Sequence, residues 1–232
     1  MSLSERTLFI VADDHPLFRD ALSHAIGKLA SGAEIVEADS LESLQQVVDA
    51  NPDADLLLLD LNMPGVSGFS ALAYIRKSHE SLPTVIVSAL DDASVIRRAI
   101  QHGASGFIPK SSSMQTIEAA IDAVLQGEVW LPEGIDIEGG TLDDEEARIA
   151  ASLSSLTPHQ FRVLMMLGEG LLNKQIAYQL GVSEATIKAH VTAILRKMQV
   201  TNRTQAVLAV QRLTVKPPGL SNDAPPAGVS EA

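Results

Sequence analysis

The 232-residue chain contains no cysteine and no apolar run long enough to cross a bilayer. Without cysteine it can form no disulfide, thiolate zinc site or cysteine nucleophile, so its stability must come from packing. Its apolar runs are far shorter than the roughly 18 residues that a membrane span requires. The N-terminal residues also lack the basic and apolar regions of a secretion signal. We therefore expect a globular cytoplasmic protein with no membrane partner.

Positive charge is scarce over the whole chain, which has a net charge of −12, but it is concentrated in one segment. From Leu156 to Leu213 there are seven basic residues and two acidic ones, which leaves −17 on the remainder. Nucleic-acid binding relies on Lys and Arg to displace phosphate counterions. The asymmetry predicts one acidic unit and a second unit that faces a polyanion. We expect the acidic unit to repel DNA until the two units rearrange.

Short apolar runs alternate with helical periodicity from Thr7 to about Gly127. The five runs are LFIVADD, EIVEA, LLLLD, TVIVSAL and GFIPK, and each is followed by a segment with helical spacing. Such repeats predict an α/β fold with a doubly wound, five-stranded parallel sheet covered on both faces by helices. Functional residues of such sheets gather at the carboxyl ends of the strands.

The periodicity divides the chain into four parts. We predict a first domain at 1–127 and an acidic linker at 128–155, with a helical stretch near Glu145 to Leu153. An all-α domain of four helices follows at 156–213. The last residues, 214–232, are rich in Pro, Gly and Ser and predict a disordered tail.

Polar residues follow four of the five predicted strands, namely Asp13 and Asp14, then Asp60, Ser88 and Lys110. If the sheet is doubly wound, these side chains converge in one crevice. Three carboxylates repel one another and are best held together by a hard divalent cation such as magnesium. A carboxylate can act as a nucleophile toward phosphorus, while a hydroxyl and an ammonium can contact phosphoryl oxygens.

Each of these residues also has a plain structural explanation. A single Asp after a strand is more often a helix cap or turn former, and a single Lys is usually a solvated charge. Their joint occurrence at successive strand ends favours the phosphoryl-transfer site. For the adjacent His15 we favour a solvent-exposed position at a helix start over a ligand role, and for Gly65 and Gly68 a role in loop geometry.

The second domain carries a helix–turn–helix pattern. Thr157, Pro158 and Gln160 form the sequence signature of a capped helix start. Two further helices are separated by a turn that contains Gly181, and the second presents Lys188, His190 and Arg196. The pattern fits a helix that enters the major groove. On spacing alone, an ordinary helical bundle with solvated basic residues remains an alternative.

The first roughly 125 residues resemble the receiver domain of two-component response regulators. The resemblance is carried by VADDHP, LLLLDLNMPGVSG, VIVSAL and GFIPKS. It implies that Asp60 is the phospho-acceptor and that Asp14, Asp60 and the backbone carbonyl of Asn62 bind Mg²⁺ or Mn²⁺, with Asp13 assisting. It also implies that Lys110 contacts the phosphoryl group and that Ser88 and Phe107 form a switch pair, with phenylalanine in place of the commoner tyrosine.

Residues from Leu156 to Arg212 resemble the LuxR/NarL-type DNA-binding domain, especially in LTPHQFRVL, GLLNKQIAYQLGVSEATIKAHV and NRTQAV. The resemblance implies that the segment from Ser183 to Met198 is the recognition helix. Lys188 and His190 would be its leading groove-facing residues, with Glu184, Thr186 and Val191 as weaker candidates. Phosphate contacts would come from Asn173, Lys174, Thr201, Asn202 and Arg203.

Together these features predict a DNA-binding transcription regulator rather than an enzyme. Asp60 would accept a phosphoryl group from a sensor histidine kinase, and a homodimer would then bind double-stranded promoter DNA. A metal-dependent phosphohydrolase is a poorer fit, because Asn62 occupies the place where a second acid would be needed. A regulator that binds DNA independently of phosphorylation, with a receiver-fold scaffold domain, remains the alternative.

Overall fold

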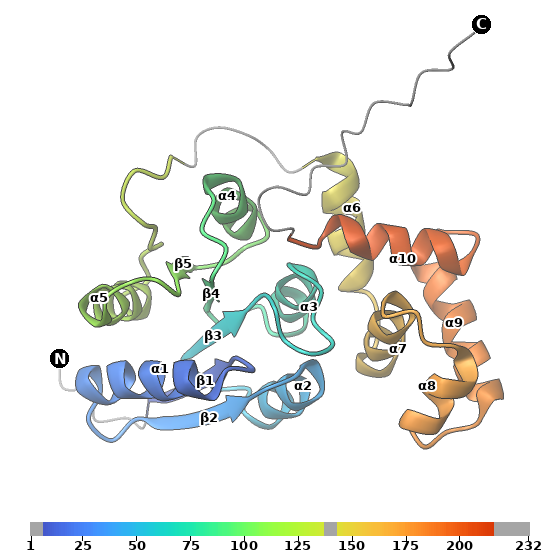
Figure 1. Cartoon of the computed structure of the whole chain (residues 1–232), viewed down its shortest axis with the longest axis horizontal. Helices are drawn as coiled ribbons and strands as arrows, with labels where there is room; N and C mark the ends of the chain where they lie inside the picture. Colours follow the sequence, from blue (N-terminus) through green and yellow to red (C-terminus); the bar gives the residue numbers. More distant parts are fainter. Residues whose placement is uncertain (1–6, 137–142, 216–232) are drawn as a thin grey trace, which may run out of the picture.

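The computed structural model describes residues 7–136 and 143–215, which form an α/β unit and a helical unit packed side by side (Figure 1). The predicted tail lies, from residue 216 onward, outside the described residues. None of the described helices is long and apolar enough to cross a membrane.

The α/β unit contains the predicted five-stranded parallel sheet, in the order β2-β1-β3-β4-β5. Its strands are β1 (Leu8–Ala12), β2 (Glu34–Ala38), β3 (Leu56–Asp60), β4 (Thr84–Ser88) and β5 (Gly106–Pro109). Asp60 pairs with Val87 and Ser88 pairs with Pro109, so the polar ends of three neighbouring strands lie at one edge. The predicted fold class is confirmed.

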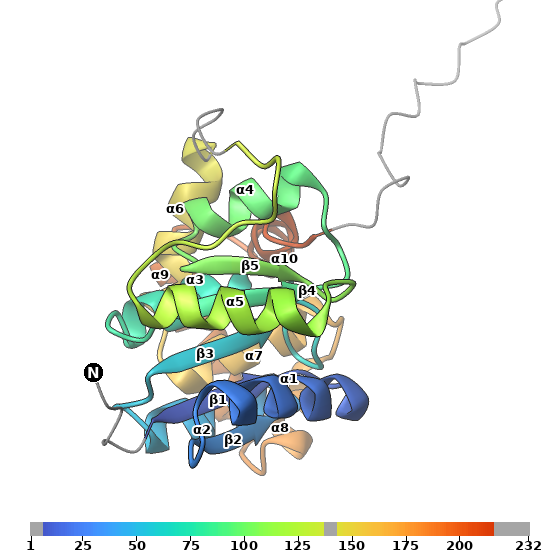
Figure 2. The same ribbon diagram turned by 90° about the vertical axis from the view of Figure 1, so that its left-hand side faces the viewer.

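Helices cover both faces of the sheet (Figure 2). One face is covered by α1 (Pro16–Leu29) and α5 (Met114–Leu125), and the other by α2 (Leu41–Ala50), α3 (Ser70–Ser78) and α4 (Ala93–Gln101). Alternate strand residues supply the two cores, with Phe9 and Val11 packed on the α1 side and Ile10 on the opposite side. Both sets are buried in β1, β3 and β4, which therefore read as continuous apolar runs, whereas the edge strand β2 is partly exposed.

The helical unit contains five helices within the described residues. They are α6 (Asp144–Leu153), α7 (Pro158–Gly168), α8 (Asn173–Gln179), α9 (Glu184–Lys197) and α10 (Arg203–Arg212). Thr157 caps α7 and forms the predicted reciprocal capping box with Gln160. Ser183 caps α9 by accepting a hydrogen bond from the Thr186 N–H.

Two parts of the predicted linker are ordered by packing. The Trp130 carbonyl accepts a hydrogen bond from the Phe107 N–H of β5, so the chain extends the sheet beyond α5. Helix α6 buries Ile149 and Leu153 between the two units. The helical stretch predicted near Glu145 to Leu153 corresponds to α6, whose carboxylates occupy its N-terminal turn and whose apolar residues face inward.

The two units share a continuous apolar core. Tyr74 of α3 stacks on Phe161 of α7 with ring centroids 4.5 Å apart and planes inclined by 13°. At the other side of the interface, the Phe69 N–H donates a 2.9 Å hydrogen bond to the Leu213 carbonyl at the end of α10. The interface therefore combines apolar packing with a backbone contact between the units.

Gly68 permits this backbone contact. Its φ is +54°, and a Cβ at this position would lie 2.1 Å from the Leu213 carbonyl oxygen. The backbone at Leu213 cannot move aside as a flexible side chain could. Gly68 therefore serves loop geometry, as predicted, and also allows the two units to approach each other closely.

We expect Gly68→Ala to separate the two units without unfolding either one. The clash should destabilise the packed arrangement by roughly 1–3 kcal/mol, in the range of other overpacking substitutions. Small-angle X-ray scattering should give a larger radius of gyration than for the wild type. Gly127→Ala is the control, because Gly127 also has a positive φ of +86° but a Cβ there would meet nothing within 4 Å. An unchanged scattering profile for Gly68→Ala would contradict the assignment.

Candidate functional site

The carboxyl edge of the sheet brings together the predicted acidic residues and the lysine. Lys110 Nζ lies 2.6 Å from Asp13 Oδ2 and 2.9 Å from Asp60 Oδ2, so one ammonium bridges two carboxylates. The Asp13 and Asp60 side chains are only 1% and 2% exposed. Buried charges need partners, and a single positive charge faces three negative ones once Asp14 is counted.

The other carboxylate oxygens lack this compensation. Asp60 Oδ1 is buried and accepts no hydrogen bond, and the same holds for Asp14 Oδ1. Ligand atoms of Asp13, Asp14, His15 and Asp60 all lie within 4.8 Å of one another. Orphaned buried oxygens that converge on one point are what a hard divalent cation would satisfy. The residues present therefore fit Mg²⁺ or Mn²⁺.

The pKa values of the site reflect the same imbalance. Burial, together with the neighbouring Asp13 charge, raises the pKa of Asp60, although Lys110 acts in the opposite direction. For Lys110, burial alone would lower the pKa, but hydrogen bonds to Asp13 and Asp60 outweigh it and raise the pKa. Lys110 thus stays charged, while ionised Asp60 is held at a cost that a cation would relieve.

The site is open to solvent on one side. A cavity of about 350 Å³ is lined by His15, Leu17, Phe18, Asp60, Asn62, Ala89 and Lys110. Leu17 is 86% exposed at its rim and Phe18 lies with its ring centroid 5.1 Å from Lys110 Nζ. Asn62 is exposed at this mouth, next to the carboxylate that it follows in sequence. A phosphoryl donor can therefore approach Asp60 from outside.

The predicted switch residues are both buried. Ser88 Oγ accepts a 3.1 Å hydrogen bond from the Leu90 N–H, which ties the hydroxyl to the loop that precedes α4. Phe107 is fully buried in the core on the side of α3 and α4. No hydrogen bond joins the Ser88 hydroxyl to Asp60 in this structure, where its oxygen accepts from Leu90.

The predicted groove-facing residues lie along α9. Glu184, Thr186 and Lys188 are exposed, and Lys188 Nζ forms a 2.9 Å ion pair with Glu184 one turn earlier. His190 and Val191 are half-buried, and the His190 ring lies 6.5 Å from that of His159. Lys188 is therefore the most accessible basic side chain among them.

The predicted phosphate-contacting residues divide into two groups. Lys174 and Thr201 are exposed and Asn173 is half-buried at the start of α8. Asn202 caps α10 by accepting a hydrogen bond from the Gln205 N–H, and Arg203 donates a 2.7 Å hydrogen bond to the Leu171 carbonyl. The last two residues therefore also have structural tasks, which sequence spacing does not reveal.

An ion-pair cluster between the two units was not predicted. Glu146 Oε1 of α6 accepts hydrogen bonds from Arg98 Nη2 at 2.8 Å and Arg98 Nε at 3.0 Å, and lies 2.7 Å from His102 Nε2. Arg98 also donates to the Arg212 carbonyl at 2.8 Å. We call Arg98, His102 and Glu146 the α4–α6 cluster. Burial lowers the pKa of His102, although Glu146 acts against this shift.

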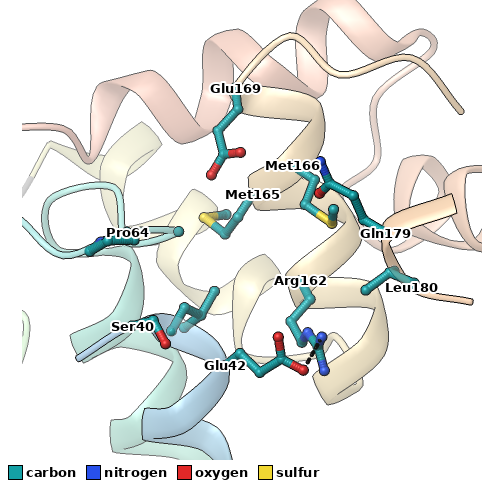
Figure 3. Close-up of a pocket in the computed structure, with 11 residues that line it drawn as sticks. Ser40, Glu42, Pro64, Arg162, Met165, Met166, Glu169, Gln179 and Leu180 are labelled. Atoms are coloured by element: carbon teal, nitrogen blue, oxygen red, sulfur yellow. Dashed lines mark hydrogen bonds and ion pairs between the residues drawn. The ribbon is translucent and has the colours of Figure 1, made fainter. Parts of the chain in front are cut away.

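A second contact joins the acidic unit to the helix–turn–helix. Arg162 Nη2 of α7 donates a 2.6 Å hydrogen bond to Glu42 Oε1 of α2 (Figure 3). This pair borders a cavity of about 280 Å³ between the units, into which Met165 and Met166 also project. Glu42, Arg162 and His190 line an adjoining cavity, so a carboxylate of the acidic unit lies beside the predicted recognition helix.

Two family models match the chain. Residues 9–122 match the response regulator receiver domain, and residues 154–210 match the bacterial regulatory proteins of the luxR family. A glycerol metabolism activator from Pseudomonas putida is 44% identical over 86% of this chain and 93% of its own length. The nitrate/nitrite response regulator protein NarL from Escherichia coli K12 is 30% identical over 91% of this chain and 98% of its own length.

Solved structures show a similar fold. RcsB from Salmonella enterica serovar Typhimurium, solved bound to a promoter with a phosphomimetic, has a TM-score of 0.53 at 22% identity. The match covers 90% of this chain and 100% of that chain.

We expect Asp60→Asn to stabilise the cation-free protein at neutral pH by about 1 kcal/mol, a typical size for a single substitution. The folded-state pKa of Asp60 lies above its ordinary value of 3.8, so ionised Asp60 destabilises the fold. This loss of unfolding free energy is absent below pH 3.8, where Asp60 is protonated in both states, and reaches its full size above the folded-state pKa of Asp60. Urea unfolding in EDTA at several pH values measures it.

The difference between variant and wild type should shrink as the pH falls toward 3.8. It should also shrink when Mg²⁺ is added, because the ion stabilises only the wild type. Asp53→Asn, at an exposed position, is the control and should change nothing. A destabilised Asp60→Asn variant in EDTA at pH 7 would contradict this reading of the site.

Proposed function

This chain belongs to the two-component response regulators that carry a LuxR-type DNA-binding domain, and we propose that Asp60 is the phosphoryl acceptor that controls its binding to promoter DNA. The observation that carries the proposal is the buried Asp60, bridged by Lys110 and left with one orphaned oxygen at an open cavity. A histidine kinase is the phosphoryl donor implied by the receiver domain.

Phosphoryl transfer would use the residues at the sheet edge in defined ways. A carboxylate oxygen of Asp60 forms the new bond to phosphorus, while the phosphorus–nitrogen bond of the donor's phosphohistidine breaks and the imidazole leaves with the electron pair. Lys110, whose ammonium already bridges Asp13 and Asp60, contacts an oxygen of the phosphoryl group added to Asp60. A divalent cation held by Asp13, Asp14, Asp60 and the carbonyl of Asn62 supplies neutralisation of the phosphoryl charge.

Ser88 would connect Asp60 to the rest of the protein. If the Ser88 hydroxyl turns toward a phosphoryl oxygen, the Leu90 N–H loses its acceptor. The loop from Ala89 to Asp92 then changes position, and α4 begins directly after it. Phe107 packs in the core beside Val95, Ile96 and Ala99 of α4. A shift of α4 would therefore change the space available to the Phe107 ring. A group added at Asp60 can therefore shift α4.

Helix α4 also holds the two units together. Its Arg98 and His102 bind Glu146 of α6, and Arg98 binds the Arg212 carbonyl at the end of α10. The Arg98 guanidinium lies 5.0 Å from the centre of the Phe69 ring, which also stacks on His102. We infer that movement of α4 weakens the α4–α6 cluster and releases the helical unit.

Release of the helical unit would favour DNA binding for an electrostatic reason. In the packed arrangement Glu42 occupies Arg162 and adds a negative charge beside His190. DNA binding improves when basic residues are free to displace phosphate counterions. Separation would remove this carboxylate from the recognition surface and let two helical units occupy adjacent half-sites as a homodimer.

We expect incubation with acetyl phosphate and Mg²⁺ to add one phosphoryl group to the wild type and none to Asp60→Asn. Intact-mass spectrometry measures the modification, and fluorescence anisotropy on promoter DNA measures binding in the same samples. Affinity should increase by about tenfold, which corresponds to about 1.4 kcal/mol. A mass gain without any change in affinity would favour the alternative of phosphorylation-independent DNA binding.

We expect Glu146→Gln to raise DNA affinity without phosphorylation. The amide keeps the size of the side chain but cannot form the ion pair with Arg98, so the packed arrangement is weakened. The dissociation constant should fall by about three- to tenfold, or about 0.7–1.4 kcal/mol. Glu145→Gln is a matched control, since the Glu145 side chain is 42% exposed and, among residues 7–136 and 143–215, binds only Arg148 of the same helix. Equal effects of the two variants would show that net charge, and not the α4–α6 cluster, is responsible.

A further inference from the structure

We propose that His15 is a ligand of the divalent cation at Asp60 and sets its preference for Mn²⁺ and related transition metals over Mg²⁺. The inference rests on the proposed cation site and adds a nitrogen ligand to its oxygen donors. The sequence favoured a solvent-exposed helix start for His15. The side chain is indeed 66% exposed, but its Nδ1 atom points back over the carboxylates.

The geometry agrees with adjacent positions on one ion. His15 Nδ1 lies 2.8 Å from Asp14 Oδ1 and 3.1 Å from Asp13 Oδ1. Two neighbouring ligands of an octahedral ion, each at about 2.1 Å, are separated by about 3.0 Å. The ligand atoms of His15 and Asp60 also lie within the 4.8 Å that encloses the whole group. The imidazole and the carboxylates thus surround a common point.

The carboxylate oxygens are divided between two kinds of partner. Lys110 Nζ forms ion pairs with Asp13 Oδ2 and Asp60 Oδ2. Asp60 Oδ1 and Asp14 Oδ1 remain without a hydrogen bond, even though His15 Nδ1 is close to the latter. His15 Nδ1 lies within hydrogen-bond distance of Asp14 Oδ1 and Asp13 Oδ1, so the position between these atoms suits either a proton on Nδ1 or a bound cation. A cation in that position would satisfy Asp60 Oδ1 and Asp14 Oδ1 together, because Lys110 contacts only the Oδ2 atoms of Asp13 and Asp60 among the described residues.

The local backbone keeps His15 in this place. Its N–H donates a 2.8 Å hydrogen bond to Asp13 Oδ1, and Pro16 starts α1 directly after it. The side chain makes no capping hydrogen bond to α1, so it has no competing task in the helix start. Nε2 has no partner among the described residues, which leaves that nitrogen to carry the proton when Nδ1 binds an ion.

An imidazole nitrogen changes which ions the site prefers. Mg²⁺ is a hard ion that binds oxygen almost exclusively. Mn²⁺ also favours oxygen but accepts imidazole more readily than Mg²⁺ does, and Ni²⁺ binds imidazole well. A site of carboxylates and carbonyls alone would discriminate weakly between Mg²⁺ and Mn²⁺. Addition of His15 should therefore strengthen Mn²⁺ binding much more than Mg²⁺ binding.

The test measures cation binding directly in the full-length, unphosphorylated protein. Free Mn²⁺ is followed by its electron paramagnetic resonance signal during titration, and Mg²⁺ is then titrated as a competitor. His15→Ala should weaken Mn²⁺ binding by about tenfold or more, with less than about a threefold effect on Mg²⁺. His15→Asn should restore Mg²⁺ affinity but not the Mn²⁺ preference, because it offers an oxygen. Electron spin echo measurements should detect ¹⁴N coupling to bound Mn²⁺ in the wild type only.

His24→Ala is the matched control, since His24 is exposed on the same helix, about nine residues away, and should bind both ions as the wild type does. Unchanged or tighter Mn²⁺ binding by His15→Ala, or equal losses for both ions, would overturn the proposal. Absence of any cation binding by the wild type would instead refute the cation site of the proposed function. Loss of binding in Asp60→Asn, with His15→Ala equal to the wild type, would refute the role of His15 alone.

Discussion

The arrangement of this protein depends on an uncompensated negative charge at the carboxyl edge of its sheet. Parallel strands bring Asp13, Asp14 and Asp60 together because their carboxyl ends point the same way, and Lys110 of β5 balances only part of that charge. Lysine stays protonated there, since the carboxylates raise its pKa. The remaining imbalance favours a cation and, after it, a group that the cation and Lys110 can both contact. The order and direction of the strands therefore create a site that favours a cation.

Most of the sheet and its site could be predicted from the sequence because both depend on local order. Each apolar run ends in the polar residue that the topology then places at the common edge, as with LLLLD before Asp60. The helix starts at Thr157 and Ser183 were equally local, since a cap involves residues three positions apart. His15 lies at the solvent-exposed helix start that the sequence predicted, whereas the direction of its Nδ1 atom toward Asp13 and Asp14 could not be predicted from spacing.

The interface between the two units could not be predicted, since its partners are far apart in sequence and unremarkable alone. Glu146 lies in an acidic run that is typical of a linker, and Arg98 and His102 look like the polar face of a surface helix. Their role at the interface becomes apparent only when the fold brings them together, as is also the case for Gly68 and Leu213. Arg203 illustrates the converse, because a residue expected at phosphate also holds the Leu171 carbonyl. The roles of such residues can be identified from tertiary contacts but not from composition.

Helix α4 starts at Ala93, just after the loop that holds Ser88 and Leu90, and its Arg98 and His102 bind Glu146 of α6. This arrangement limits how a change at Asp60 can reach the helical unit. A ligand shifts an equilibrium only by the difference in its interaction with the two states. A phosphoryl group on Asp60 touches neither Glu146 nor Glu42, so it can favour separation only if α4 has a different position when Ser88 leaves Leu90. If α4 moves in this way, the Ser88–Leu90 hydrogen bond and the Arg98–Glu146 ion pair are energetically coupled, and a double-mutant cycle between Ser88 and Glu146 should give a non-additive effect on domain separation.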